Sequence, residues 1–315
     1  MPVIVGAGAV ITPPPPAIST GPVPLSVIYV DPDGGQWSLS DRDGDVHVTA
    51  LTGLGGPPSL LTVIGLPGGG ALPQQMIPAI RTIILGLFVE AGEQGDFLAL
   101  QDSLARAFWT QRGGAPSAGT LIVGRPDGTA RQIAVYCTTG LDQADDDSTK
   151  SGLAWSTYTL TFQAPDPLFA DAEPVTIEFV ATPVGAGVPP MPPVDLAPGS
   201  VLGLTTVTNS GDADAYAVWT IFGPGTPVLS NLTTGLAFGL NAPLGPTEVV
   251  TVDTRPGMQS AIDGTGANRW ANLVQADPRD LWPLLPGDND LDLTLGGSGP
   301  TSAIVMSYTR RWLRA

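Results

Sequence analysis

Cysteine, histidine and lysine each occur once in this sequence, as Cys137, His47 and Lys150. A single cysteine allows no disulfide within the chain, so the fold has to be stable without a covalent cross-link. A single histidine excludes metal sites built from several histidines, and a Ser-His-Asp triad would have to use His47. His47 stands in the alternating segment "DVHVTAL", which is typical of a strand, so we predict no catalytic role for it.

Positive charge is scarce as well. The chain of 315 residues has 13 Lys and Arg against 29 Asp and Glu, a net charge of −16. This balance argues against general binding to nucleic-acid phosphates or anionic lipid, which needs the opposite sign of charge. Long apolar runs are missing too: the longest, "IILGLFV", is far short of the roughly 20 residues that span a bilayer. The start has no basic segment followed by a cleavage site, so we expect neither a signal peptide nor membrane insertion.

Motifs for cofactors and catalysis are incomplete. "VGAGAV" lacks the third glycine of a dinucleotide fingerprint, and "ITPPPP" after it cannot form the helix that would hold a pyrophosphate. Lys150 does not stand in a P-loop. The carboxylates of "DPDGG", "DRDGD" and "PGDND" occupy turn positions, where Asp is typical for local backbone hydrogen bonding. We therefore expect no cofactor, no metal and no enzymatic activity.

Two further segments have ordinary structural interpretations. The acidic run "DQADDDSTKSG" lacks the spaced ligands, the glycine and the final Glu of a calcium loop, and is interpreted as a solvated loop. Cys137, in the strand-like "RQIAVYCTT", is interpreted as a buried small hydrophobic residue and not as a reactive thiol.

The chain is rich in glycine, proline and apolar residues. With 40 Gly, 33 Pro and 43% hydrophobic residues, it has the composition of a turn-dense β protein that is long enough for two domains. Residues 1–171 contain strand-like segments such as "PLSVIYVD", "SLLTVIGL" and "IRTIILGLFVEA", and a hairpin pattern in "GTLIVGRPDGTARQIAV". The sequence therefore predicts a first domain built mainly from strands.

One helix is predicted in this domain, from an N-cap at Asp96 to about Thr110. Its apolar residues recur at spacings of three and four, and Gly113-Gly114 is expected to end it. The predicted buried face comprises Phe97, Leu100, Leu104 and Phe108.

The rest of the chain divides into a connector and a second domain. Residues 172–200 contain the strand-like "TIEFV" and a proline-rich segment, which predicts an extended connector. Residues 201–315 show short strands at the spacing of a β-sandwich and no helical period. Near the end, "LPGDND" predicts a turn, and Leu291, Leu293 and Leu295 predict a strand with one buried face. The predicted fold class is mainly β.

Several motifs in the second domain occur in a characteristic order. An Asn-x-Gly-Asp turn precedes an aromatic strand, a "VDT" strand precedes a small Asp-Gly turn, and a Trp-x-Leu-x-Pro-Gly-x-Asn corner follows. In this order and spacing the segment from Val207 to Leu295 resembles the C-terminal half of the distal tail proteins of long, non-contractile-tailed bacteriophages. The residues that carry the motifs are Asn209, Gly211, Asp212, Asp253, Asp263, Gly264, Trp282, Leu284, Pro286, Gly287 and Asn289. The first domain resembles the ring-forming half of that family more loosely.

The resemblance implies a structural virion protein, made in the host cytoplasm and placed at the distal end of the phage tail. It implies a homo-oligomeric ring, a hexamer, that joins the tail tube protein to the tail tip or baseplate hub protein. The tape measure protein and receptor-binding proteins are further partners that it suggests. The second domain would be a galectin-like sandwich that points outward, with Trp282, Leu284 and Leu285 closing one end. DNA would pass through the lumen without specific binding.

Charge adds an expectation about that lumen. Because each copy contributes about −16, we expect part of the acidic residues to face the central hole and repel DNA phosphates. The candidates come from two acidic segments: Asp41, Asp43, Asp45, Asp145, Asp146 and Asp147.

Two alternatives for the function remain open: a carbohydrate-binding module that recognises the host through the second domain, and an enzyme that acts on envelope polymers with a carboxylate pair.

Overall fold

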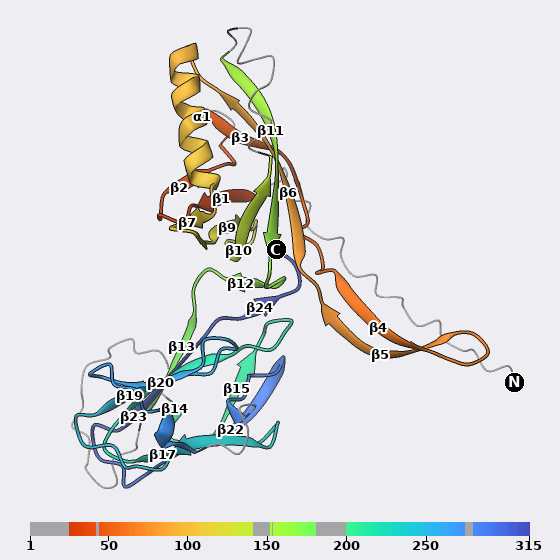
Figure 1. Cartoon of the computed structure of the whole chain (residues 1–315). Coiled ribbons are helices and arrows are strands. Elements are labelled where there is room, and N and C mark those ends of the chain that lie inside the picture. Colours follow the sequence, from red (N-terminus) through yellow and green to blue (C-terminus); the bar gives the residue numbers. More distant parts are fainter. Residues whose placement is uncertain (1–24, 42–43, 141–151, 153, 181–199, 275–279) are drawn as a thin grey trace, which may run out of the picture.

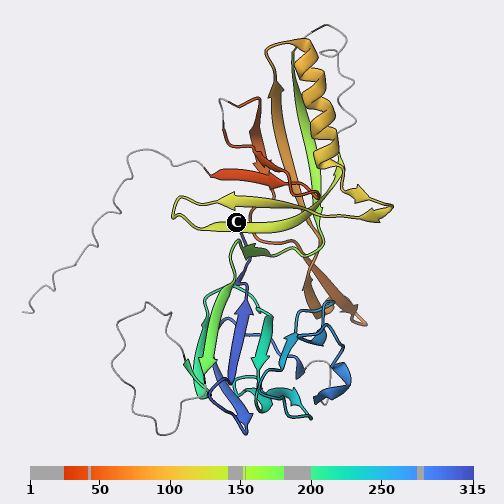
Figure 2. The same ribbon diagram turned by 90° about the vertical axis from the view of Figure 1, so that its left-hand side faces the viewer.

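The computed structural model describes residues 25–41, 44–140, 152, 154–180, 200–274 and 280–315. The chain forms two β-rich lobes with one α-helix in the described part, and a hairpin extends sideways from the region between them (Figure 1). Figure 2 shows the same two lobes in a perpendicular view. The mainly β fold class is confirmed.

The first lobe contains a nine-stranded antiparallel sheet. Seven strands follow the order β2-β1-β9-β10-β11-β6-β3, and β12 and β24 extend it beside β10. The hairpin predicted around the Pro-Asp-Gly turn is present as β9 and β10. The strands of this sheet are β1 (Ser26–Val30), β2 (Gln36–Ser38), β3 (Val46–Thr52), β6 (Arg81–Glu90), β9 (Gly119–Gly124), β10 (Ala130–Thr139), β11 (Trp155–Ala164), β12 (Phe169–Asp171) and β24 (Arg311–Trp312).

The helix of this lobe, α1 (Gln94–Phe108), begins and ends earlier than predicted. Its N-cap is Glu93, and Asp96 lies inside the first turn. An acidic residue is favourable there because the first turn exposes backbone N–H groups and the positive end of the helix dipole, so Asp96 marked the helix start without being its cap. The helix ends at Trp109, and the Gly113-Gly114 pair instead turns a small hairpin of β7 (Gln111–Arg112) and β8 (Ala115–Pro116).

The predicted apolar face of α1 packs on the sheet. Phe97, Leu104 and Phe108 are buried, and Leu100 is half-buried. Phe108 stacks on Tyr29 of β1 with 4.6 Å between the ring centroids, and the Tyr29 hydroxyl donates to the Ala107 carbonyl at 3.3 Å. The first hydrophobic core therefore lies between the helix and one face of the sheet.

The second lobe is a sandwich of two sheets. A six-stranded sheet has the order β14-β13-β23-β16-β19-β20, and a five-stranded sheet has the order β15-β22-β17-β18-β21. The strands are β13 (Val175–Val180), β14 (Ser200–Val201), β15 (Gly203–Asn209), β16 (Ala217–Phe222), β17 (Thr226–Asn231), β18 (Leu236–Leu240), β19 (Val249–Asp253), β20 (Ser260–Asp263), β21 (Leu273–Val274), β22 (Gly287–Gly296) and β23 (Ala303–Tyr308), with a short 3-10 helix at Trp270–Asn272.

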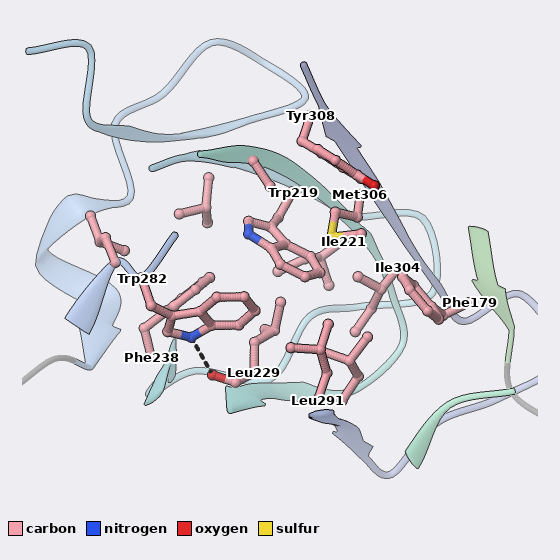
Figure 3. Close-up of a cluster of buried hydrophobic side chains, with 14 of the residues drawn as sticks. Phe179, Trp219, Ile221, Leu229, Phe238, Trp282, Leu291, Ile304, Met306 and Tyr308 are labelled. Atoms are coloured by element: carbon pink, nitrogen blue, oxygen red, sulfur yellow. Dashed lines mark hydrogen bonds between the residues drawn. The ribbon is translucent and has the colours of Figure 1, made fainter. Parts of the chain in front are cut away.

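The core of the sandwich is aromatic at its centre. Trp219, Trp282 and Phe238 lie edge to face or tilted, with centroids 5.2 to 6.3 Å apart (Figure 3). The Trp282 indole N–H donates to the Leu229 carbonyl at 3.3 Å. The three leucines of the β22 alternation are buried as predicted, but β22 begins at Gly287. The predicted turn "LPGDND" is therefore wrong in part: Asp288 to Asp290 already pair with β15.

The chain crosses between the lobes twice. It leaves the first lobe after β12 and enters the second as β13, and it returns from β23 to pair as β24 with β12. Phe179 of β13 belongs to the second core, and Trp312 of β24 packs against the first. The two ends of the second lobe are thus attached to the first lobe side by side.

A charge placed on the buried face of α1 should unfold the first lobe. Leu104 is 4% exposed, so an unpaired carboxylate at Leu104→Asp loses its hydration, and we expect a loss of about 3 kcal/mol or more in unfolding free energy. Leu98→Asp is the matched control, because Leu98 lies on the same helix and is 42% exposed. Chemical denaturation of both variants measures the difference, and equal stability would show that the packing of α1 is incorrect.

Candidate interaction site

The residues with catalytic potential do not come together in the described chain. His47 lies on β3 with its ring 5.1 Å from that of Phe88, and its buried Nδ1 has no hydrogen-bond partner. Cys137 is half-buried on β10, and burial raises the pKa of its thiol to about 11. No group of three or more His, Cys, Asp or Glu among the described residues could hold a metal ion, and no described helix is long and apolar enough to cross a membrane.

The asparagines of the predicted motifs stabilise one corner of the second lobe. The buried Asn209 side chain donates to the carbonyls of Ala213 and Leu284 at 3.0 and 3.1 Å and accepts from the Gly211 N–H at 3.0 Å. The buried Asn289 accepts from the Leu285 N–H at 2.9 Å and donates to the Leu285 carbonyl at 2.8 Å. Both amides satisfy backbone groups of the turn after β15 or of the segment before β22.

A third buried asparagine acts at the same corner. Asn231 donates to the Pro283 carbonyl at 3.3 Å and accepts from the Thr233 N–H at 3.0 Å. Asn231 also begins an Asn-Leu-Thr sequon, but its side chain is fully buried and is engaged in the fold.

The other motif residues lie in tight turns and in the core. Trp282 and Leu284 are buried at 1% and 0% exposure, so neither side chain is available to a ligand. Pro286 is exposed, and Gly287 opens β22 with a φ of +93°, which favours glycine. A Cβ on Gly211 would lie 2.8 Å from the Arg311 carbonyl oxygen, and the Asp212 carboxylate accepts from the Leu313 N–H at 3.1 Å.

The remaining motif residues belong to Asp-centred turns. Asp253 pairs with Arg255 at 2.6 Å, and Asp263 pairs with Arg269 at 2.8 Å. Hydrogen bonds from Thr265 and Arg269 hold the pKa of the Asp263 carboxyl well below its usual range. Gly264 follows in the same turn, next to the β19–β20 ladder. These residues shape the surface and do not form a shared site.

The acidic candidates for a lumen remain a prediction. Asp41 and Asp45 are exposed beside the start of β3. Asp43, Asp145, Asp146 and Asp147 lie outside the described residues, as does Lys150.

The most prominent exposed apolar surface is a hairpin of β4 (Ser59–Gly65) and β5 (Ala71–Pro78), which we call the arm. The two strands form a sheet of their own that projects away from the first lobe (Figure 1). Every residue of both strands is exposed, including Leu61 at 53%, Leu72 at 56% and Met76 at 69%. "SLLTVIGL" was predicted to be a strand, which is confirmed, but its projection from the domain and its partner strand were not predicted.

The arm is also free of charge. Residues 48–80 contain no Asp, Glu, Lys, Arg or His, although the chain has 42 residues of the first four types in all, the sum of its 13 basic and 29 acidic residues. This uncharged stretch is the sequence signal that could have identified the arm as a separate functional element.

A buried arginine fixes the base of the arm. Arg81, the first residue of β6, is 1% exposed, and all four of its hydrogen bonds go to backbone carbonyls. The guanidinium donates to Pro167 at 2.7 Å, to Gly53 and Gly55 at 2.6 Å each, and to Leu313 at 2.8 Å. It also lies 4.8 Å from the centroid of the Phe169 ring. Arg81 therefore joins the arm, the β12 loop and the returning C-terminal segment.

Charged and aromatic side chains hold the two lobes together next to Arg81. Asp171 of β12 accepts from Arg310 at 2.5 Å and from the Trp312 indole N–H at 2.6 Å. The Arg131 guanidinium stacks 3.9 Å from the centroid of the Trp312 ring. A cation–π pair and a carboxylate that accepts from two donors both fix the relative orientation of the side chains involved. The two lobes are therefore joined in a defined way.

Comparisons with protein-family models and with curated proteins find no match to this sequence. Among solved structures, the chain is similar to the Dit (gp 19.1) protein of phage SPP1, described as a paradigm of the hub adsorption apparatus in phages that infect Gram-positive bacteria. The TM-score is 0.62 at 15% identity, over 91% of this chain and 98% of that one.

This chain has the fold of a phage distal tail protein. A second similar structure, the phage p2 baseplate in its activated conformation with strontium, agrees with a TM-score of 0.53 at 10% identity, over 91% of this chain and 98% of that one. Because the coverage is nearly complete on both sides, the similarity to these two structures includes both lobes.

The raised pKa of Cys137 predicts an unreactive thiol. At pH 8 a thiol with a pKa near 11 is ionised in roughly one molecule in a thousand, so we expect iodoacetamide to modify native Cys137 far more slowly than a free thiol. Modification should become fast above pH 10 or after denaturation in urea. Rapid labelling of the native protein at pH 8 would contradict the burial of this side chain.

Removal of the Arg81 hydrogen bonds should weaken both the arm base and the lobe junction. Arg81→Met keeps the apolar stem but leaves the four carbonyl partners without this donor, so we expect a loss of about 2 kcal/mol or more in unfolding free energy. Arg81→Lys, which can restore only part of the bonds, should be intermediate. Hydrogen exchange should rise around Gly55 and Leu313 in Arg81→Met. Unchanged protection there would show that Arg81 does not stabilise the arm base and the lobe junction.

Proposed function

We propose that this protein is a structural component of a phage tail tip, in which copies of the chain form a ring at the distal end of the tail tube. The observation that carries the proposal is the fold shared with SPP1 Dit across nearly the full length of both chains.

The proposal assigns a task to each part of the chain. Residues 1–171 form the ring together with β24, which returns to the first lobe, and the rest of residues 201–315 forms the outward sandwich, to which β13 of the intervening segment adds a strand. The ring, a hexamer, joins the tube protein to the tip or baseplate hub and leaves a lumen for DNA. Tape measure and receptor-binding proteins are further proposed partners, and exposed carboxylates such as Asp41 and Asp45 keep DNA from binding to the lumen.

We do not propose carbohydrate recognition by the second lobe. Glycan sites commonly present an exposed aromatic side chain, whereas in the described part of this lobe the tryptophans are buried or half-buried. Trp219 and Trp282 lie in the core, and Trp270 packs against it.

The test is the assembly state of the purified full-length chain. We expect negative-stain images to show closed rings with a central hole, because a heterologous contact that repeats by rotation closes on itself. The rings should become more stable with moderate salt, which screens repulsion between copies that each carry −16.

Double-stranded DNA supplies the second arm of this test. An acidic lumen predicts no retention of DNA in a mobility-shift assay at low salt, where binding by phosphate contacts would be strongest. Open filaments, or monomers at every soluble concentration, would contradict the ring. DNA retention that weakens with salt would contradict the acidic lumen and leave the ring intact.

A further inference from the structure

We infer that the first lobe carries a binding site for a neutral saccharide, in the hollow around Trp109 between α1 and β7 (Figure 1). Such a site goes beyond the proposed function, because it adds ligand binding to the first lobe and does not depend on a ring.

Trp109 is the most exposed of the seven tryptophans in the chain. It follows the last residue of α1, and 56% of its surface is accessible, against 46% for Trp155. The other five tryptophans are buried or half-buried. A large apolar ring in contact with water has a free-energy cost, which burial against a ligand removes. An indole in this position is therefore a surface on which a ligand can stack.

The backbone beneath this indole is held in place by Arg112 of β7. The Arg112 guanidinium donates to the carbonyls of Trp109 and of Arg106, the latter at 3.1 Å. It also donates to the two Asp33 carboxylate oxygens at 3.1 and 2.7 Å, and this contact holds the pKa of the Asp33 carboxyl below its usual range. A guanidinium with this many fixed acceptors has little freedom to move. The aromatic platform is thus positioned before any ligand arrives.

Unused hydrogen-bonding groups lie beside the indole. Ala105, Arg106, Arg112 and Asp33 line the same hollow, which has a volume of about 500 Å³. Among the described residues the Arg106 guanidinium donates only to the Ser103 hydroxyl, at 3.4 Å, so most of its N–H groups are available. The Asp33 side chain is 69% exposed, and a carboxylate has about four acceptor positions, more than Arg112 fills. The hollow therefore offers an apolar ring together with spare donors and spare acceptors.

This combination fits a sugar ring. A pyranose has a face of C–H groups, which stacks on an aromatic ring, and a rim of hydroxyls, each of which both donates and accepts. Hydroxyls need donors and acceptors side by side, and a guanidinium beside a carboxylate supplies both. The volume of the hollow also lies within the range of small-molecule sites, about 300 to 1,000 Å³.

The balance of charges at the hollow indicates a neutral ligand. The positive charges of Arg106 and Arg112 are offset by Asp33 in the hollow and by Asp31, whose charge acts on Arg112. The whole chain carries −16, so an anionic polymer is repelled at long range. A cationic ligand would compete with Arg112 for Asp33 and disturb the contact that positions the indole. A neutral saccharide meets neither obstacle.

A protein partner fits the hollow less well. The cores of protein interfaces are depleted of charged residues, and a standard interface buries about 800 Å² on each side. In the part of the chain that the structure describes, Trp109 is the only large apolar side chain that lines the hollow, and three of the four other lining residues are charged. A small ligand with hydroxyl groups needs no wider apolar surface.

The experiment measures saccharide binding to the full-length chain and to Trp109→Ala. The probes are maltotetraose, cellotetraose and chitotetraose, which are neutral and differ in linkage and in N-acetyl groups, and isothermal titration reports the affinity for each. Trp155→Ala is the matched control, because Trp155 is the second most exposed tryptophan, stacks on Phe88 and does not line the hollow.

We expect the wild type to bind at least one probe with a dissociation constant on the order of 1 mM or below. Trp109→Ala should bind that probe at least about tenfold more weakly, because the stacking surface is lost, and Trp155→Ala should bind it like the wild type. The melting temperature of Trp109→Ala should be unchanged, because the removed ring is exposed. Asp33→Asn should also weaken binding, because it removes a carboxylate acceptor and loosens Arg112.

Three results would overturn the inference. One is no binding of any of the three probes at roughly 10 mM, tenfold above the expected constant. Another is equal binding to the wild type and to Trp109→Ala, because the saccharide then binds elsewhere. The third is a Trp109→Ala variant whose assembly state changes while its saccharide binding does not, because the hollow then holds a protein. None of these results contradicts the proposed ring, which is tested on images of the wild type.

A second measurement requires no variant. N-bromosuccinimide oxidises exposed indoles, and peptide masses report which tryptophans have reacted. In the native protein Trp109 should react first, and the saccharide that binds should protect it while Trp155 reacts at an unchanged rate. Equal oxidation of Trp109 with and without the saccharide would overturn the inference, even if Trp109→Ala failed to fold.

Discussion

The guanidinium of Arg81 is the constraint on which the arrangement of the molecule depends. Its donors bind carbonyls from the arm base, from the loop before β12 and from the last residues of the chain. A guanidinium presents five N–H groups in one plane and remains charged even though burial lowers its pKa. A lysine or an apolar side chain could not satisfy three separate backbone segments at once. The direction of the arm and the attachment of the second lobe therefore have a common origin.

The sequence predicted the parts of the fold that repeat. The alternation of Leu291, Leu293 and Leu295, the Pro-Asp-Gly hairpin and the apolar face of α1 depend on local periodicity, and all three are confirmed. The residue types expected at caps and turns predicted the ends of helices and strands less reliably. Asp96 and the "PGDN" segment have the composition of a cap and a turn, but one lies in the first turn of a helix and the other pairs as a strand. The "PGDN" segment pairs with the distant strand β15, and the local sequence pattern contains no information about such a partner.

The candidate site was predicted in part. The motif residues Asn209 and Asn289 lie at one buried corner, and Asn231, which is not one of the motif residues, joins them there. The arm, and the role of Arg81 at its base, were not predicted, for a different reason. Arg81 occupies the first position of a strand-like segment, where an arginine usually marks an exposed end, and its four carbonyl partners are 26 to 232 residues away in sequence. The uncharged stretch 48–80 was visible, but hydrophobicity alone does not separate a core strand from an exposed one.

The two crossings between the lobes have a mechanical consequence. The second lobe is attached by two neighbouring backbone connections, one before β13 and one after β23, and the returning end is fastened by the β12–β24 ladder and by Asp171. A pulling force on that lobe is therefore shared by two parallel tethers, and a protease cut in either one leaves the lobe joined through the other. A lobe appended at the end of a chain has one tether and would be released by a single cut. In this protein the second lobe stays attached until both connections are broken.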